Sequence, residues 1–418
     1  MKRSYIKLIL AFAFTLFLVA ACAQNEDYAV LLNKAKESLK NERDASQEEL
    51  NEGYYEEIVA LLEKVITLKP DNTEAKYFLG YAYSRLNSSD GKSMINMNPE
   101  LVLKSSEQFE AVNKLSPKYT GELFILDPYS KITSEWGSMA MCYLYNDQPD
   151  SASWAFHEGK KRGGFSDYIL QINRETLEAC TKNSILLTSG DSFTIPLWYL
   201  QSVEKYRKDV AIIDVAMLNT TWYPSFLFKN KIIRDNPEKE NVNTEDYYIE
   251  WTDSLITIND FSWRLKPRFY DHYLIRSDII LLNILQNNKL DSDVYFTPGF
   301  SSSESLGLKD YTYPMIVVDK FCADRKETFH YDDYKKLIKE ILMSSKYLNK
   351  NSTDEVRLFG YYRYYLLMQI NHYLDIDEID KAKELLYIHD EYGEEASLPY
   401  QSDFEKRIIG NIRYKLSD

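Results

Sequence analysis

The chain has 418 residues and a formal net charge of −14, because 64 Asp and Glu residues outnumber 50 Lys and Arg residues. So acidic a chain disfavours nucleic acid or an anionic membrane surface as its main partner. The length predicts two or three domains, each able to bury a core. Four cysteines without paired spacing disfavour a disulfide framework or a zinc site, although a single bridge between distant cysteines stays open.

The first 22 residues predict a signal peptide. Three basic residues precede an apolar run at 8–21, which is short for a membrane span and long enough for a signal peptide. The segment Val19-Ala20-Ala21-Cys22 has the small-residue pattern of a lipoprotein cleavage box, so we expect Cys22 to become an acylated N-terminus. The alternative is ordinary cleavage before Gln24. We therefore expect a lipid-anchored protein of the bacterial envelope, in the outer membrane, with a periplasmic or secreted protein as the alternative.

Residues 23–182 are predicted to form helical repeats. A helical segment at 56–68 ends in Pro70-Asp71-Asn72, and the next helix carries Leu79-Gly80 with Tyr83 three residues later. This pattern resembles the tetratricopeptide repeat, in which a small residue lets two helices approach closely and a proline closes the second helix. A third helix pair, ending near Gly159, follows. Apolar stripes of this kind are mainly packing features, but stacked repeats also form concave surfaces that bind peptides or partner proteins.

Residues 183–321 are predicted to form a small, mainly parallel α/β domain. Apolar runs at 185–188 and 210–215 flank a helix, which is the pattern of a βαβ crossover. A helix at 278–286 and strands at 293–297 and 314–318 continue it. Such folds place ligands at the carboxyl ends of their strands. We therefore expect the two loops that follow the first two strands to be neighbours.

These two loops supply the candidate ligand-binding residues, which are Gly190, Asp191, Thr194, Trp198, Asn219 and Trp222. Each has a structural alternative: Asp191 can cap the following helix, Gly190 can provide backbone freedom, and Asn219 can be a turn residue. The two tryptophans can belong to the core, or they can form a carbohydrate-binding surface beside an Asp and an Asn. The five histidines lack ligand spacing and no phosphate loop is present, so we expect no metal and no cofactor.

Residues 322–418 predict a second helical region. Helices are expected at 358–374, 379–391 and 403–414, with Pro399-Tyr400 before the last one. The first two can form a fourth repeat pair. The predicted fold class is therefore α + α/β, with tetratricopeptide-like helical repeats flanking a small mainly parallel α/β domain.

Two motifs in the α/β domain, GDSFTIPLWYLQ at 190–201 and LNTTWY at 218–223, carry a family resemblance. They resemble the soluble C-terminal region of bacterial protein O-mannosyltransferase-like proteins, which carry GDNDTFPLWY after one strand and LLNTDWY after the next. The resemblance covers roughly residues 175–410 and implies a domain of unknown function. In those relatives the sugar-transfer chemistry is expected in a multi-span membrane part, which has no counterpart here.

Three positions depart from this family pattern. Ser192 and Phe193 stand where the family has Asn and Asp, and Thr221 stands where it has Asp. Two carboxylates are thus lost, while Asp191 and Asp209 remain. A metal site or an acid/base pair built from the family's acids is weakened accordingly.

These observations favour a lipid-anchored envelope scaffold that binds a partner protein through its helical repeats. The alternative is a module that binds a glycan or a glycosylated peptide through the α/β site, accessory to glycosyl transfer or surface assembly. A hydrolase or transferase acting through Asp191 is the least favoured hypothesis, because no complete catalytic set accompanies it.

Overall fold

The computed structural model describes residues 28–42, 53–88, 94–236, 247–324, 329–395 and 398–417. The predicted signal peptide and Cys22 lie outside these residues. The chain divides into two compact units between Glu135 and Trp136. Within the described ranges, no helix combines the length and the apolar character that a membrane span requires.

The first unit is helical. It contains a helix at 28–41, α2 (Tyr54–Leu68), α3 (Thr73–Asn87), the 3₁₀ turn η1 (Met94–Asn96), α4 (Pro99–Leu115) and the start of α5 (Pro128–Tyr145). The Asn72 side chain accepts a hydrogen bond from the Ala75 amide at 2.6 Å and so caps α3. A Cβ atom at Gly80 would lie 2.9 Å from the Phe109 ring of α4. The expected close approach at Gly80 is therefore confirmed.

The second unit begins with helices and a βαβ crossover. Its first elements are α6 (Pro149–Lys161), α7 (Asp167–Ala179), β1 (Ile185–Thr188), α8 (Asp191–Ser202), β2 (Ala211–Asp214), the 3₁₀ turn η2 (Ala216–Asn219) and α9 (Tyr223–Lys229). The predicted strand, helix and strand between 185 and 215 are thus confirmed. Short strands follow at β3 (Tyr248–Glu250), β4 (Ser254–Ile258), β5 (Phe261–Leu265) and β6 (Tyr273–Ile275), before α10 (Arg276–Asn288) and β7 (Val294–Phe296).

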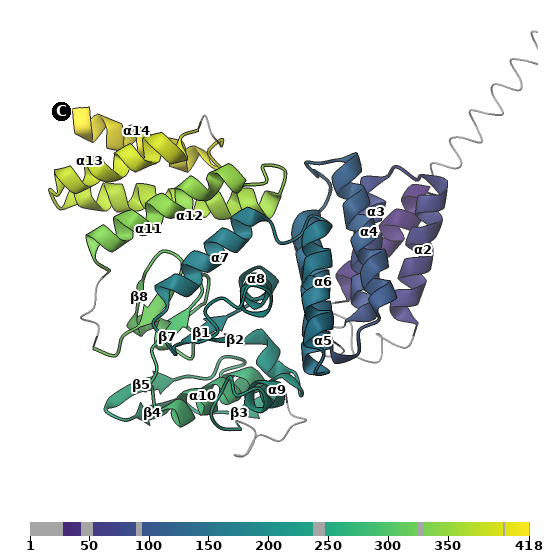
Figure 1. Cartoon of the computed structure of the whole chain (residues 1–418), viewed down its shortest axis with the longest axis horizontal. Coiled ribbons are helices and arrows are strands. Elements are labelled where there is room, and N and C mark those ends of the chain that lie inside the picture. Colours follow the sequence, from purple (N-terminus) through teal and green to yellow (C-terminus); the bar gives the residue numbers. More distant parts are fainter. Residues whose placement is uncertain are drawn as a thin grey trace, which may run out of the picture. The chain divides into compact units, whose positions relative to one another are not determined.

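The main sheet has the strand order β2-β1-β7-β9-β8, where β8 is Thr312–Pro314 and β9 is Asp319–Phe321. Strands β2, β1 and β7 are parallel, with Thr188 paired to Asp214, whereas β9 and β8 are added antiparallel. Nearly every residue of the three parallel strands is buried, as expected for a sheet covered on both faces. In Figure 1 α8 and α10 lie on opposite sides of these strands. The fold class is α + α/β, as predicted.

The predicted strand at 314–318 is wrong. Ile316 has a left-handed backbone (φ 71°), and 315–318 form the turn that joins β8 to β9. Its apolar residues are nevertheless buried, because Ile316 and Val317 belong to the core of the C-terminal helices. The segment is therefore apolar because it is a buried turn, and its composition resembles that of a buried strand.

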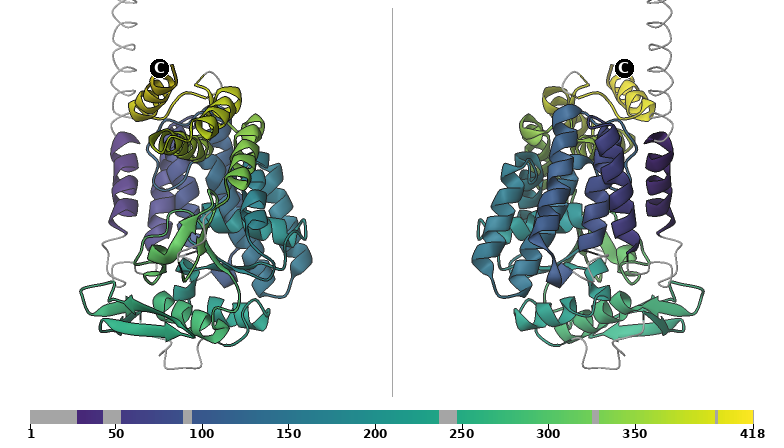
Figure 2. Two further views of the ribbon diagram at one scale, coloured as in Figure 1. Left: turned by 90° about the vertical axis from the view of Figure 1, so that its left-hand side faces the viewer. Right: turned by 90° about the vertical axis from the view of Figure 1, so that its right-hand side faces the viewer.

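The C-terminal helices share one core with α7. They are α11 (Tyr331–Met343), the 3₁₀ turn η4 (Ser344–Tyr347), α12 (Thr353–Asp375), α13 (Ile379–Ile388), the π-helical turn η5 (His389–Gly393) and α14 (Asp403–Ser417). Arg363 is fully buried in this core and donates to the carbonyls of Leu398 and Pro399, at 2.6 and 3.0 Å. Within this unit, Figure 2 shows the β4–β5 hairpin at the end away from α13 and α14. The three predicted helices of this region are confirmed.

The packing of α6 against α5 predicts the effect of a small substitution. A Cβ atom at Gly159 would lie 2.6 Å from Trp136 Cβ and 2.7 Å from the Phe165 ring. We expect Gly159→Ala to lower the free energy of unfolding by roughly 1–3 kcal/mol, because the added methyl group must displace atoms close to the backbone. Urea denaturation followed by circular dichroism measures this. The matched control is Gly410→Ala in α14, which meets open space and should stabilise by up to about 1 kcal/mol. Equal stability of the two variants would contradict the packing argument.

Candidate functional site

The first loop of the candidate site joins β1 to α8. Gly190 is the N-cap residue of α8 and has φ 86°, a conformation that favours glycine. Asp191 is exposed and is the first residue of the helix, not its cap, so its negative charge lies where the helix dipole favours it. Pro196 lies inside the helix, beyond its first turn, and has no amide hydrogen to donate to the Ser192 carbonyl.

A buried carboxylate joins this loop to the second strand. Asp214 is the last residue of β2 and is only 3% exposed. The Thr194 hydroxyl donates to its Oδ2 at 2.5 Å, and the Met217 amide donates to its Oδ1 at 3.0 Å. The Thr188 hydroxyl, at the end of β1, lies 2.7 Å from that of Thr194. The expected proximity of the two loops is therefore confirmed, and Asp214 connects them.

The electrostatics of Asp214 differ from those of a surface acid. Burial raises the pKa of its carboxyl to about 6. The hydrogen bonds from Thr194 and from the Met217 amide favour the charged form and lower the pKa, whereas the negative charge of Asp191 raises it. Because burial is the largest effect, the pKa stays above its ordinary value.

The second loop reaches this network through Tyr223. Its hydroxyl accepts a hydrogen bond from the Asp214 amide at 3.1 Å, and its side chain is 1% exposed. Burial raises the pKa of Tyr223 strongly, so this phenol stays protonated. Neither Asp214 nor Tyr223 was among the predicted site residues. A signal for Asp214 was present, since it is the one acidic residue inside the apolar run at 210–215.

Asn219 takes a structural position. Its Oδ1 accepts a hydrogen bond from the Ser277 amide at 2.9 Å, and its Nδ2 donates to the Ala216 carbonyl at 3.2 Å. Ser277 lies in the first turn of α10, where amides lack partners within their own helix. Asn219 therefore caps α10 from a neighbouring segment, and its carboxamide is engaged on both sides.

The two candidate tryptophans are interior residues. Trp198 is 7% exposed and Trp222 is 5% exposed. The Trp222 ring contacts Tyr145 edge to face, with centroids 5.3 Å apart, and also packs near Phe226. Neither indole presents a face on which a sugar could stack.

Asp209, the other acid that remains from the family pattern, lies at the opposite edge of the sheet. It precedes β2, whereas Asp191 follows β1, and four-residue parallel strands separate these edges by roughly 13 Å. Arg207 binds both carboxylate oxygens of Asp209 at 3.0 and 2.9 Å, and this contact lowers its pKa. An acid/base or metal-binding pair of Asp191 and Asp209 is therefore excluded.

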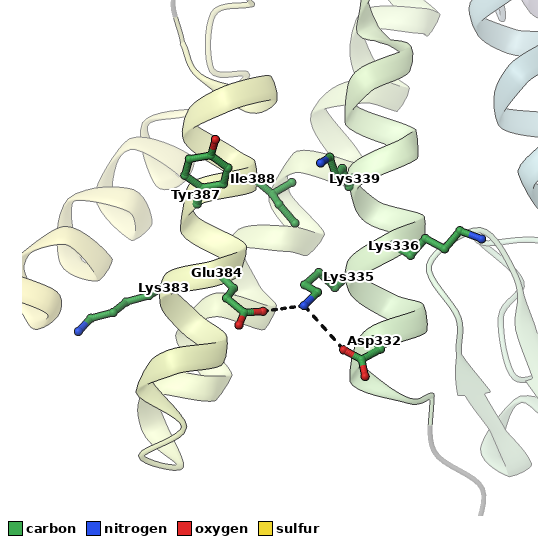
Figure 3. Close-up of a pocket in the computed structure, with 8 residues that line it drawn as sticks. All are labelled: Asp332, Lys335, Lys336, Lys339, Lys383, Glu384, Tyr387 and Ile388. Atoms are coloured by element: carbon green, nitrogen blue, oxygen red, sulfur yellow. Dashed lines mark hydrogen bonds and ion pairs between the residues drawn. The ribbon is translucent and has the colours of Figure 1, made fainter.

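Surface hollows in the described part of the chain offer other ligand positions, and we describe two of them. A cavity of 340 Å³ lies at the edge of the sheet that holds Asp209, lined by polar residues that include Asn183 and Asn288. A groove of 510 Å³ lies between α11 and α13. Figure 3 shows Lys335 in this groove between Glu384 and Asp332, at 2.7 and 3.7 Å, while Lys336 and Lys383 point away. Lys335 is therefore compensated by two carboxylates, which weakens the groove as an anion site.

The network around Asp214 organises the loops. Its one acid is buried and bonded on both oxygens. Across the ranges that the structure describes, no three His, Cys, Asp or Glu side chains lie close enough together to bind a metal ion. The arrangement can hold Gly190 and Asp191 at the surface in a defined conformation, which suits binding.

The raised pKa of Asp214 predicts a pH dependence of stability. Its value is about 6 in the folded chain, against an ordinary 3.8, so the folded chain binds this proton more tightly than the unfolded chain. This group therefore lowers the free energy of unfolding as the pH rises from about 4 to about 6, by roughly 3 kcal/mol at most. Urea denaturation across this pH range should show that the free energy of unfolding of Asp214→Asn declines less with rising pH, or rises more, than that of wild type.

The asparagine is a conservative replacement here. Its Oδ1 can still accept from the Met217 amide, and its Nδ2 can donate to Thr194, whose hydroxyl then donates to Thr188. Asp214→Ala is the control, since it leaves the Met217 amide without its acceptor and should destabilise at every pH by roughly 1–3 kcal/mol. Identical pH profiles for wild type and Asp214→Asn would refute the assignment.

Comparison with known proteins identifies one segment. Residues 170–260 match the family model of TMEM260-associated domain 2, a domain related to TMEM260 and to O-mannosyltransferases. No curated protein and no solved structure matches the chain. The matched segment contains both motifs, from α7 through β1, α8, β2 and α9, and thus the whole Asp214 network.

Proposed function

We propose that this chain is a lipid-anchored scaffold of the bacterial envelope whose helical hairpins bind a partner protein. The observation that carries the proposal is Trp154 on α6, which is 48% exposed. Its ring stands against Trp136 and Tyr143, with centroids 5.7 and 6.4 Å away, so the indole is held in place. Exposed and pre-positioned tryptophans are typical anchors of protein interfaces.

The hairpins also support this proposal through their construction. Gly80 and Gly159 each lie where a Cβ atom would collide with the neighbouring helix, as in repeats of the tetratricopeptide type. Repeats of this kind present broad faces to partner proteins. The acidic charge of the chain favours a protein partner over a nucleic acid.

The second candidate function is binding of a glycan or a glycosylated peptide by the α/β domain. The match of residues 170–260 to a domain related to O-mannosyltransferases favours it. The surface first expected to carry it is poorly suited, because Trp198 and Trp222 are buried and Asn219 caps α10. A glycan would need other exposed rings. Hydrolysis or group transfer through Asp191 is less well supported, since the neighbouring acid, Asp214, is sealed from solvent.

The scaffold proposal predicts the result of a crosslinking pull-down from detergent-solubilised envelopes. We expect wild type and Asp191→Ala to retain the same protein partner, and Trp154→Ala to lose most of it, because truncation of a central interface tryptophan commonly costs about 2 kcal/mol or more. Tyr387→Ala, at a residue that is 66% exposed on α13, is the matched aromatic control. Loss of the partner in Asp191→Ala alone would move the function to the α/β site.

The proposed anchor has its own test. Cys22→Ala should abolish incorporation of labelled palmitate and move the protein from the membrane fraction to the soluble fraction, because it removes the acylated cysteine. A single acyl chain binds membranes only marginally, so stable anchoring depends on multiple acylation at this residue. A wild-type protein that carries no palmitate label and lies in the soluble fraction would overturn the lipoprotein proposal and favour cleavage before Gln24.

A further inference from the structure

A cluster of aromatic rings lies on the small sheet formed by β3 and β6. Its members are Tyr247, Tyr248, Phe269, Tyr270 and Tyr273. Tyr248 is the hub, with its ring centroid 4.9–6.2 Å from those of the other four. Three of the rings are open to solvent: Tyr247 is 47% exposed, Tyr248 is 46% exposed and Tyr270 is 76% exposed.

The position of Tyr270 is costly for the backbone. Tyr270 and Asp271 form the two-residue turn before β6, and both have positive φ, 51° and 57°. Turns with two left-handed central residues strongly prefer Asn-Gly, because a bulky side chain there is strained by about 1 kcal/mol or more. Since the Tyr270 ring is mostly exposed, burial does not offset this strain. Folding alone therefore does not account for a tyrosine at this position.

The surroundings of the cluster define the charge of a suitable ligand. Arg268 lies over the Phe269 ring at 5.1 Å, but its guanidinium is paired to Asp278 at 3.1 Å and lies 3.6 Å from Glu304. Arg268 is therefore already paired with carboxylates and is a poor partner for an anionic ligand. Glu250 and Asp271, both exposed, add further negative charge. An uncharged ligand fits this surface better than a phosphate, a sulfate or an acidic peptide.

We propose that the cluster centred on Tyr248 and Tyr270 is a binding platform for a neutral oligosaccharide. Pyranose rings offer apolar C–H faces that stack on aromatic rings, while their hydroxyls hydrogen-bond to phenols and carboxylates. Exposed tyrosines flanked by Glu250 and Asp271 match both requirements. This platform supplies the exposed rings that the glycan-binding alternative requires, and it is independent of the scaffold role.

The platform is linked to the candidate site through α10. The Arg276 amide, in the first residue of α10, donates to the Tyr247 carbonyl at 3.0 Å, and the adjacent Ser277 amide donates to Asn219. The aromatic cluster and the loop after β2 thus meet the same helical turn.

The test measures binding of neutral oligosaccharides to the full mature chain by isothermal titration calorimetry. The panel consists of mannotriose, cellohexaose, laminarihexaose and xylohexaose, with a sulfated disaccharide as the charged comparison. We expect saturable binding of at least one neutral member, weakened about tenfold or more by Tyr248→Ala and by Tyr270→Asn. Tyr387→Ala should bind as wild type does.

Tyr270→Asn separates function from folding. Asparagine tolerates the left-handed conformation, so this variant should raise the denaturation midpoint while it weakens binding. Absence of binding to every neutral member, or equal binding by wild type and both platform variants, would overturn the proposal. The scaffold role is judged separately, because Tyr270→Asn should still retain the protein partner in the envelope pull-down.

Discussion

The hydrogen bond between Thr194 and the buried Asp214 carboxylate is the contact on which the α/β region depends. It connects the first turn of α8 to the end of β2. The same carboxylate accepts a hydrogen bond from the Met217 amide in η2. The parallel register, which pairs Thr188 with Asp214, brings these groups to one edge of the sheet. Removing a carboxylate from water is expensive, and the protein compensates by satisfying both oxygens. One acid therefore holds the loops on either side, and the pKa of this acid depends on how the loops bury it and hydrogen-bond to it.

This constraint explains the positions of the residues in the two motifs. Motif residues that attract attention in the sequence are used to build the edge: Trp198 and Trp222 fill the interior, and Asn219 caps α10. At the surface the motifs present Asp191, Ser192 and Thr221, and Asp191 follows a glycine with a positive φ. A site of this construction offers shape and one negative charge to a ligand, and binding is the chemistry that such a site performs best. The two binding roles that we propose therefore use exposed side chains elsewhere, Trp154 for a partner protein and Tyr270 for a glycan.

The elements with strong patterns were predictable from the sequence. The apolar runs of β1 and β2 were found because a helical segment lies between them, which is the pattern of a βαβ crossover. Gly80 correctly marked a close helix contact. The strand expected at 314–318 failed because an apolar run also suits a turn buried under helices, which periodicity does not distinguish. Asp214 was missed because a single acid at a strand end looks like a boundary residue until its burial is known. Asp209, in contrast, was kept as a remaining acid of the family pattern, although it lies at the amino end of β2 and not at the carboxyl ends where the two loops meet.

Arg363 and Tyr270 both lie in positions that are unfavourable for folding, the first because it is a buried cation and the second because its φ is positive. Arg363 is fully buried, which is unfavourable for a cation, but the carbonyls of Leu398 and Pro399 and the carboxylate of Glu405 surround its guanidinium. Its burial is thus explained by the chain segment that it fastens to the helical core. The backbone strain at Tyr270 is not offset by burial of its side chain, because its ring is the most exposed of the aromatic cluster. This combination of strain and exposure at Tyr270 is the reason for our proposal that the residue belongs to a binding surface.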